Sequence, residues 1–455
     1  MDSRRFKLFY IVVFILTFFF VYTFSGNESV PKEYVLEDLK KIVSNGTVPS
    51  EIDEPEDVDP KDLPNYKLEG MDRFEWYAKK RKEEIIKNKI KEVPVLKDDV
   101  EISMLSAYEY DVEYTVSITT KDIDRSILYC RYFDEDGEEI LPAFQSYNFP
   151  VFAVNCEKRK GTQRISISTQ ATNNYTYPID LIDRTKKDNY KYEFSFCMAP
   201  FYGNESKWLF IAELVEHYRL QGMTHFYFYV YHINQYDNAI LQDYVRTGEA
   251  EVIYLLDRDD ESVLWQQIVN RDCVLRSRHE SKWVLHADLD ERLLMTKYPG
   301  TILDYLRNFN DTTVGALIFR QQWIFKTEFL PEKYEGDKQI DTWLPTLRWH
   351  NSSSFGPHLH TTKCIIMPEK VFSMWVHYPK IWYPGYRWYM LGVEEGIVRH
   401  YRDQNMQDWK NKYLQRTLKF GPTSLTNYPE KYQKSLTEAV KRRTKYVYEK
   451  YKMIN

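Results

Sequence analysis

Residues 191–420 alternate between two hydrophobic patterns, and this alternation constrains the fold more than any other feature of the chain. Short aromatic or β-branched runs are typical of buried strands, whereas longer segments with apolar residues every three or four positions are typical of helices. The strand-like runs are 194–200, 226–231, 251–256 and 283–287, and the helical segments are 208–221, 240–246 and 264–278. Such alternation predicts an α/β domain with a mainly parallel sheet covered by helices on both faces.

The last of these strands runs into three acidic residues, Asp288, Asp290 and Glu291. Because side chains alternate along a strand, we expect Asp288 and Asp290 to point the same way at the carboxyl edge of the sheet, where α/β proteins bind ligands. Two neighbouring carboxylates repel each other unless a cation lies between them and an anionic ligand. Oxygen ligands suit Mg²⁺ or Mn²⁺, with a phosphate completing the coordination. The alternative is a solvated strand end that forms salt bridges with Arg292.

The N-terminus predicts a membrane anchor. Residues 8–24 contain no charged side chain and are rich in Phe, Ile and Val, so the segment is long enough for a thin bilayer. Arg4, Arg5 and Lys7 precede it, and this places the N-terminus in the cytosol by the positive-inside rule. We expect residues 1–7 to be a cytosolic tail and 8–24 an uncleaved signal anchor of a type II protein. A cleaved signal peptide is the alternative, although no good cleavage site follows the run.

Asn-x-Ser/Thr sequences and the sparse cysteines fit a lumenal, oxidising compartment. The possible glycosylation sites are Asn27, Asn45, Asn174, Asn204, Asn310 and Asn351. The 5 cysteines show no Cys-x-x-Cys spacing, and Cys130 with Cys156 is the easiest local disulfide. A net charge of −5 and a lumenal address both argue against nucleic-acid partners.

The segments outside the α/β region differ from it in composition. Residues 25–102 are acidic and punctuated by proline, as in a solvated stem, with one predicted helix over 74–91. Residues 103–190 contain short alternating runs and predict a small β-rich domain, whose role is either structural or glycan-binding. Residues 421–455 are basic and predict a helical C-terminal tail that packs on the protein or faces solvent.

Several segments together resemble glycosyltransferase family 92. In chain order they are 202–208, 217–227, 243–249, 281–293, 319–328, 363–371, 383–387 and 394–403. The resemblance implies a GT-A-type, Rossmann-like nucleotide-sugar fold in a type II Golgi membrane protein. It also implies metal-dependent transfer from a nucleotide sugar. Nematode members include enzymes that add β-galactose to the core fucose of N-glycans. We therefore expect UDP-galactose as donor, Mn²⁺ as cofactor and a glycan or glycoprotein as acceptor, with inversion at the sugar.

The resemblance also implies which residues bind the cation and the nucleotide. It makes Asp290 the direct metal ligand, while Asp288 contacts the ribose or a water bound to the metal. His400 matches a late histidine that serves as a further metal or diphosphate ligand, with His377 as its rival. We therefore expect Asp288, Asp290 and His400 around the cation, and Arg399 or the nearby Arg402 on the phosphate.

Other candidate residues follow from their positions relative to these. Glu394 and Glu395 precede His400 in the order in which many inverting GT-A enzymes place their general base, so we expect one of them to deprotonate the acceptor. The competing candidates for the base are Glu328 and Asp341. Asp257, with Asp259 and Asp260, follows the third strand and is expected at the uracil or ribose. The candidate aromatic platforms for a sugar are Trp323, Trp349, Trp382 and Tyr386.

Three functions remain open at this point. The favoured one is a metal-dependent galactosyltransferase. A phosphohydrolase with Asp288 as nucleophile is the second, although Arg292 stands where such a site wants Thr or Val. The third is a non-catalytic glycan-binding ectodomain whose transferase core has decayed, which the intact Asp288, Asp290 and His400 argue against.

Overall fold

The computed structural model describes residues 73–87, 102–119, 127–172, 176–255, 263–405, 409 and 413–452. The predicted anchor at 8–24 and most of the predicted stem lie outside these residues. Within the described ranges, every helix is too short or too polar to cross a bilayer.

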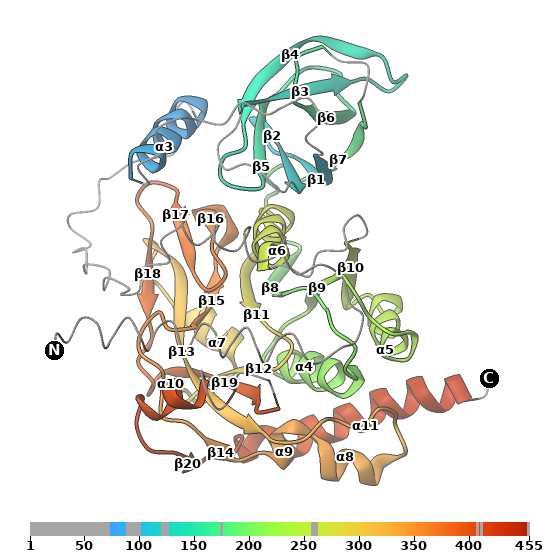
Figure 1. Cartoon of the computed structure of the whole chain (residues 1–455), viewed down its shortest axis with the longest axis vertical. Helices are drawn as coiled ribbons and strands as arrows, with labels where there is room; N and C mark the ends of the chain where they lie inside the picture. Colours follow the sequence, from blue (N-terminus) through green and yellow to red (C-terminus); the bar gives the residue numbers. More distant parts are fainter. Residues whose placement is uncertain are drawn as a thin grey trace, which may run out of the picture. The chain divides into compact units, whose positions relative to one another are not determined.

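The first half of the main sheet is parallel and alternates with helices (Figure 1). Its strands are β8 (Tyr192–Met198), β9 (His225–Val230), β10 (Ala250–Tyr254) and β11 (Ser281–Ala287), joined by α4 (Trp208–Leu220), α5 (Gln235–Arg246) and α6 (Val263–Ser277). This confirms the α/β alternation predicted from the sequence. The spatial order β10-β9-β8-β11 means that the connections run outward from β8 and then return to its other side. Such a switch point is where α/β sheets bind ligands.

The second half of the sheet is mixed, so the prediction of a mainly parallel sheet is wrong here. Strand β15 (Lys363–Ile366) runs antiparallel to both β11 and β13 (Val314–Lys326). Strand β19 (Gly396–Asp403) runs parallel to β13 and antiparallel to β12 (Glu291–Met295). The parallel pattern ends at β11, whose next neighbour is the antiparallel β15, while the chain itself turns tightly from β11 into β12 without a crossover helix.

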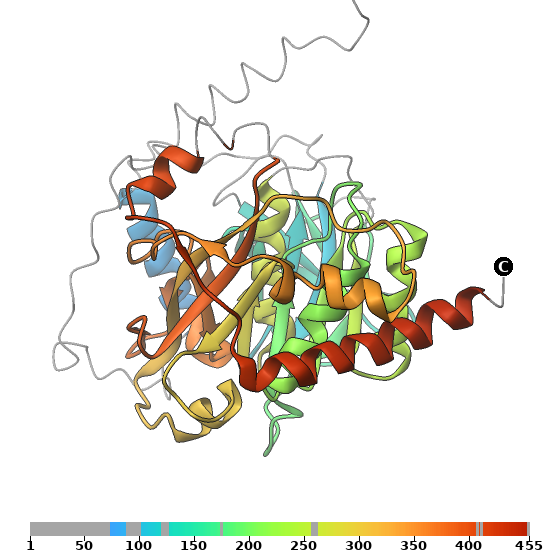
Figure 2. The same cartoon turned by 90° about the horizontal axis from the view of Figure 1, so that it is seen from below.

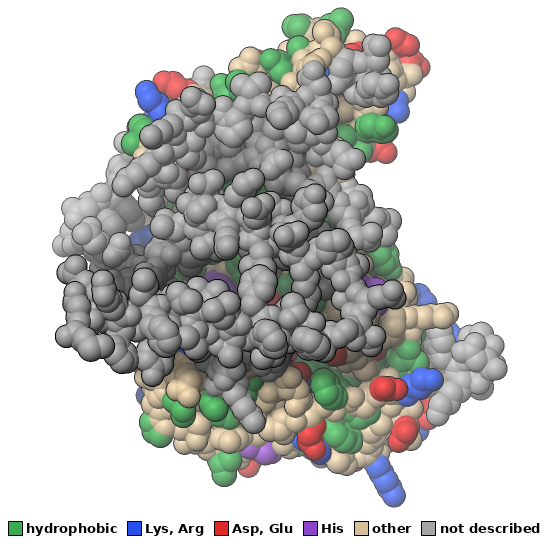
Figure 3. Space-filling view, in the orientation of Figure 1, with side chains coloured by type: hydrophobic (Ala, Val, Ile, Leu, Met, Phe, Trp, Pro, Cys, Tyr) green, Lys and Arg blue, Asp and Glu red, His purple; other side chains and the backbone are tan. Residues whose placement is uncertain are grey.

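Short elements complete this half of the chain. They are α7 (Ile302–Asn308), α8 (Asp337–Trp343), α9 (Pro345–Arg348), β14 (Asn351–Ser352), η2 (Pro368–Lys370), β16 (Val371–Met374), β17 (Pro379–Trp382), β18 (Arg387–Met390), α10 (Leu414–Leu418) and β20 (Ser424–Leu425). On the described surface in Figure 3, acidic, basic and apolar side chains are interspersed, as is usual for a globular domain.

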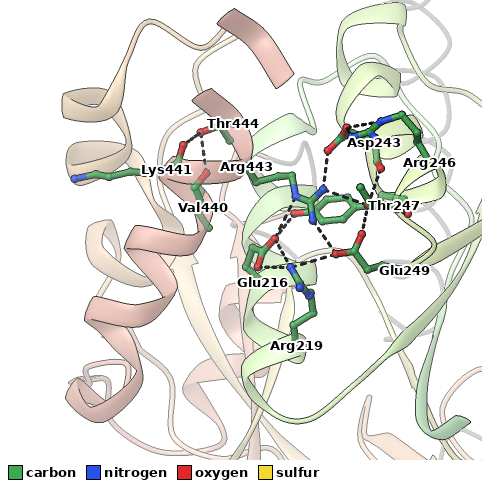
Figure 4. A network of polar contacts seen from close by, with 11 residues as sticks. Glu216, Arg219, Asp243, Arg246, Thr247, Glu249, Val440, Lys441, Arg443 and Thr444 are labelled. Atoms are coloured by element: carbon green, nitrogen blue, oxygen red, sulfur yellow. Dashed lines mark hydrogen bonds and ion pairs between the residues drawn. The ribbon is translucent and has the colours of Figure 1, made fainter. Parts of the chain in front are cut away.

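The basic segment predicted as a tail is a long helix, α11 (Glu430–Lys452), that packs across α4, α5 and α8 (Figure 2). Its apolar face buries Leu436, Val440, Val447 and Tyr448 in the main hydrophobic core. On the same helix, Arg443 enters a network of acidic side chains from α4 and α5 (Figure 4). The spacing of these buried residues is that of one face of a helix, which explains why the segment packs instead of extending into solvent.

Residues 103–183, within the segment predicted as a β-rich domain, form a seven-stranded sheet. Its strands are β1 (Ser103–Glu109), β2 (Glu113–Thr119), β3 (Ile127–Phe133), β4 (Glu139–Tyr147), β5 (Ala153–Glu157), β6 (Arg164–Ser168) and β7 (Ile179–Asp183), in the order β4-β3-β6-β7-β1-β2-β5. A bridge between Asn148 and Val154 connects the two ends of this order. The predicted disulfide Cys130–Cys156 is present in its core.

Helix α3 (Arg73–Lys87), within the predicted stem, packs on the folded part of the chain. The Tyr77 hydroxyl donates to the buried Glu113 carboxylate at 2.7 Å, and the Trp76 ring stacks on Tyr383 with centroids 5.6 Å apart. A second disulfide, Cys197–Cys273, joins β8 to α6, and the remaining cysteine, Cys364, is buried. The fold therefore extends into the segment that composition assigned to a solvated stem.

Candidate active site

A cleft of about 1210 Å³ opens at the switch point between β8 and β11. Its lining comes from the segment after β8 with the start of α4, the segment after β9 with the start of α5, the start of α6, the turn after β11, the segment after β13 and the end of β19. Among the lining residues are Tyr202, Asp288, Asp290, His400 and Arg402. The position is the one that the strand order predicts for a ligand site.

A turn, rather than strand alternation, brings Asp288 and Asp290 into this cleft. Strand β11 ends at Ala287, and the Glu291 amide then donates to the Asp288 carbonyl oxygen at 3.2 Å. The Glu291 carboxylate accepts from the Asp288 amide at 2.8 Å, which closes the turn from the other side. As a result, both aspartates line the cleft while Glu291 is buried.

The register between β12 and β19 brings His400 to this turn. Glu291 pairs with His400 across the two strands, and His400 Nε2 lies 3.0 Å from Asp290 Oδ2. Burial raises the pKa of Asp290, but the charges of His400, Arg402 and Lys363 outweigh it and hold that pKa well below its usual range. Asp290 is therefore an ionised carboxylate that faces the cleft.

Lys363 is a buried cation that the sequence analysis did not assign to the site. It begins β15, next to the end of β11, and its Nζ lies 2.7 Å from Asp288 Oδ2 and 3.2 Å from Glu291 Oε2. Burial lowers the pKa of Lys363, but these two carboxylates raise it above its ordinary value. Burial raises the pKa of Glu291, and Lys363 only partly opposes that rise. The sequence feature that could have pointed to Lys363 is a lysine at the start of an apolar strand.

The donor set of this cleft fits a divalent cation. Asp288 and Asp290 offer carboxylate oxygens and His400 offers an imidazole, which are ligands that Mn²⁺ accepts. In the described part of the chain, no three such side chains are close enough together to hold a metal by themselves. A cation here would need oxygens from a ligand or from water. His377, the rival histidine, does not line the cleft, and burial lowers its pKa to about 3.

Of the two arginines expected at the phosphate, Arg402 lines the cleft and Arg399 does not. Arg399 is buried and donates to the hydroxyl and the carbonyl oxygen of Thr426, at 2.9 and 3.1 Å. Adjacent strand residues face opposite ways, so Arg399 points away from the side of β19 that carries His400, whereas Arg402 lies two residues beyond His400 and lines the cleft. Arg292, the partner proposed for a solvated strand end, instead pairs with Glu213 at 2.9 Å.

The structure does not bring Glu394 and Glu395 to the cleft. They precede β19, and Gly396 pairs with Met295, so they lie at the far end of β12 from Asp290. At about 3.3 Å per residue, that separation exceeds about 12 Å. The Glu395 carboxylate accepts from the Tyr389 hydroxyl at 3.1 Å. The prediction that one of them is the general base therefore has no geometric support.

The other candidates for the base, Glu328 and Asp341, are not among the residues that line the cleft. Glu328 pairs with Arg348 at 2.6 Å, and Asp341 on α8 pairs with Lys441 at 2.5 Å. Besides the two aspartates, the carboxylates that line the cleft are Glu205, Glu332 and Asp403. The predicted nucleotide contacts Asp257, Asp259 and Asp260 lie outside the described residues.

Different aromatic residues line the cleft from those that were predicted. Trp323 and Trp349 are buried, and Trp382 packs edge-on against Trp388. Tyr386 lies under the ammonium group of Lys370. The cleft is lined instead by Phe201, Tyr202, Phe210, Tyr231, Tyr236, Trp265 and Phe329. Tyr202 and Phe329 are 64% and 59% exposed, so their rings are accessible to a ligand.

Comparison with known proteins decides the family. The model of glycosyltransferase family 92 matches residues 192–436, more than half of the chain. The chain belongs to glycosyltransferase family 92. The match begins at β8, includes every element that lines the cleft and ends within α11. Asp288, Asp290, His400 and Arg402 thus lie in the family region.

Individual relatives are more distant. Beta-1,4-galactosyltransferase galt-1 of Caenorhabditis elegans is 24% identical over 229 residues, which are 48% of this chain and 50% of that protein. The chain thus spans about half the length of this curated relative. Among solved structures, GalNAc-T7 with UDP, GalNAc and Mn²⁺ is 12% identical, with a TM-score of 0.30, over 50% of this chain and 46% of that one. TarS of S. aureus is 14% identical, with a TM-score of 0.20, over 30% and 36%.

Proposed function

We propose that this member of glycosyltransferase family 92 transfers galactose from UDP-galactose to a glycan acceptor, with inversion and with Mn²⁺ as cofactor. The observation that carries the proposal is the convergence of Asp288, Asp290 and His400 on one cleft at the switch point of the sheet. The family and the galactosyltransferase relative support a sugar donor, and the core fucose of N-glycans is the proposed acceptor. We further propose a GT-A-type fold and a Golgi location, with residues 8–24 as a type II anchor.

In this proposal, Asp290 and His400 hold the cation and Asp288 contacts the ribose or a bound water. When bound, the cation supplies Lewis-acid neutralisation of the charge that develops on the departing diphosphate. Arg402 faces the same side of β19 as His400 and would donate hydrogen bonds to the diphosphate. A carboxylate must accept the acceptor's proton, and we place that base among Glu205, Glu332 and Asp403 because these line the cleft.

We propose that Tyr202 and Phe329 receive the acceptor sugar. Both rings are exposed in the cleft, and the apolar C–H face of a sugar packs well on an aromatic ring. The pKa of Tyr202 is raised, first by desolvation of its hydroxyl and then by the charges of Asp288 and Asp290. The hydroxyl therefore stays protonated near the carboxylates and can donate a hydrogen bond to a sugar oxygen.

The test is UDP release by the full-length chain from a panel of UDP-sugars. We expect turnover with UDP-galactose, Mn²⁺ and a fucosylated N-glycan, and at least about a hundredfold less for Asp290→Ala because charge neutralisation is lost. Glycan binding without turnover of any nucleotide sugar would favour the hypothesis of a non-catalytic glycan-binding ectodomain. Hydrolysis of simple phosphate esters without a nucleotide sugar would favour a phosphohydrolase. Microscopy with a Golgi marker, combined with protease protection of the C-terminus, tests the location and topology.

A further inference from the structure

Lys363 cancels much of the negative charge that the acidic turn would otherwise present to a cation. Its ammonium group lies 2.7 Å from Asp288 and 3.2 Å from Glu291, and its side chain is 3% exposed. Strand β15 is hydrogen-bonded to β11 on one side and to β13 on the other, so the lysine cannot swing into solvent. One buried positive charge is thus shared between two of the three carboxylates in the turn.

The oxygen atoms of those two carboxylates are already engaged. Asp288 accepts from Lys363 through Oδ2 and lies 3.4 Å from Gln266 Nε2 through Oδ1. Glu291 accepts from Gln321 at 2.8 Å and from the Asp288 amide at 2.8 Å, and its side chain is 1% exposed. Asp290, whose Oδ2 lies 3.0 Å from His400 Nε2, is the acidic residue of the turn that lines the cleft without an ion pair to Lys363.

A single carboxylate with an imidazole is a weak site for a hard divalent cation, which usually requires several oxygen ligands. A nucleotide diphosphate brings the missing oxygens and negative charge. The more of its own carboxylate charge the protein neutralises, the weaker the cation binds to the empty cleft. The nucleotide diphosphate then contributes a larger share of the cation affinity.

We propose that Lys363 is a positioning residue that, by neutralising Asp288, makes the cation bind together with the nucleotide diphosphate and not to the empty cleft. This proposal rests on the metal-dependent function proposed above. It assigns Lys363 a role beyond the structural one of pairing with the buried Glu291. If that structural role were the whole role, removing the lysine would destabilise the protein without strengthening its binding of a cation.

The test is calorimetric titration of the full-length chain with Mn²⁺, with and without saturating UDP. We expect UDP to tighten Mn²⁺ binding by at least about a hundredfold in the wild-type protein. In Lys363→Met, loss of one positive charge beside the site strengthens binding of Mn²⁺ alone by at least about tenfold, and UDP then adds less. Lys363→Arg keeps the charge and should bind Mn²⁺ alone as weakly as the wild type.

Lys370→Met is the matched control. Lys370 is also buried, but it donates to the carbonyl oxygens of Thr312 and Val314 and does not line the cleft. We expect this variant to bind Mn²⁺ with unchanged affinity, so it controls for the loss of a buried lysine as such.

Each outcome separates this inference from the function on which it rests. Wild-type protein that binds Mn²⁺ alone as tightly as with UDP overturns the inference, whether or not Lys363→Met folds. A folded Lys363→Met with no gain in Mn²⁺ affinity also overturns it and leaves the proposed function intact. Failure of the wild-type protein to bind Mn²⁺ even with UDP overturns the metal dependence itself.

Discussion

Replacing Arg443 with methionine should destabilise the protein by removing the central cation of the network in Figure 4. The guanidinium group lies 2.6 Å from Asp243, 2.8 Å from Glu249 and 3.5 Å from Glu216, and its side chain is 13% exposed. It also lies 4.2 Å from the centroid of the Tyr244 ring. A methionine side chain fills much of the volume of the arginine side chain, so the substitution removes the charge of Arg443 and the interactions that depend on it.

The expected loss of unfolding free energy depends on which ion pairs of the acidic residues remain after the substitution. Breaking a buried ion pair costs about 3–5 kcal/mol when the partner is left unpaired. Here Asp243 keeps Arg246 at 2.6 Å, and Glu216 and Glu249 keep Arg219 at 3.1 and 3.3 Å. We therefore reduce the ionic cost to about 2 kcal/mol and add about 1 kcal/mol for the lost contact with the aromatic ring. The free energy of unfolding should fall by about 3 kcal/mol.

Urea denaturation measures this difference. With a slope of about 3 kcal/mol per molar, the midpoint for Arg443→Met should fall by about 1 M. Arg442→Met is the matched control, because Arg442 is the preceding residue of the same helix and is exposed. Equal midpoints for the two variants would refute the view that this network holds α11 on α4 and α5.

Four further predictions concern the cleft, the β-rich domain and acid stability. Arg402→Gln should raise the KM for UDP-galactose about tenfold, while Arg399→Gln should lower the melting temperature without changing that KM. Phe329→Ala should raise the acceptor KM by about fivefold to tenfold and leave acceptor-independent donor hydrolysis unchanged; a rise in the donor KM would place the ring at the nucleotide instead. Deleting residues 1–99 removes α3 and leaves the buried Glu113 carboxylate without its partners Arg73 and Tyr77. The free energy of unfolding, measured by thermal melting, should therefore fall by about 3 kcal/mol, whereas a chain starting at residue 60 should show no such loss. Burial, reinforced by Arg292, lowers the pKa of His217 to about 3, so His217 is neutral when folded and binds a proton more readily when unfolded. Urea midpoints should therefore fall as pH drops below about 6.5, and less steeply in His217→Gln.

Local pattern was enough to predict the α/β alternation, but it assigned the positions of Asp288 and Asp290 to strand alternation, whereas a turn places them in the cleft. The helix predicted over 208–221 is α4, and the strand predicted over 194–200 is β8, each within two residues at either end. The choice of Arg402 over Arg399 was also within reach, because residues 400 and 402 share a face of any strand. The same strand geometry separates Glu394 and Glu395 from His400, since the chain between them is extended.

Contacts between residues distant in the sequence could not be predicted in this way. Lys363 reaches Asp288 across 75 positions because β15 lies antiparallel beside β11, and hydrophobic pattern does not encode strand order. The packing of α3 on Glu113 and of α11 on α4 likewise depends on tertiary partners. Composition indicated a solvated stem around α3 and a tail at α11 because both helices carry many charged residues.

Helix α6 contacts both the β-rich domain and the cleft. Near its C-terminal end, the Asp272 carboxylate accepts from Tyr108 of β1 at 2.7 Å and from Tyr229 of β9 at 2.6 Å. At its other end, Trp265 and Gln266 line the cleft, and Gln266 reaches Asp288. Because an α-helix of this length is stiff, a small displacement at one end of α6 is expected to move the other end. Because the same helix contacts β1 through Asp272 and the cleft through Gln266, we expect substitutions at Tyr108 in β1 to change the position of Gln266 relative to Asp288.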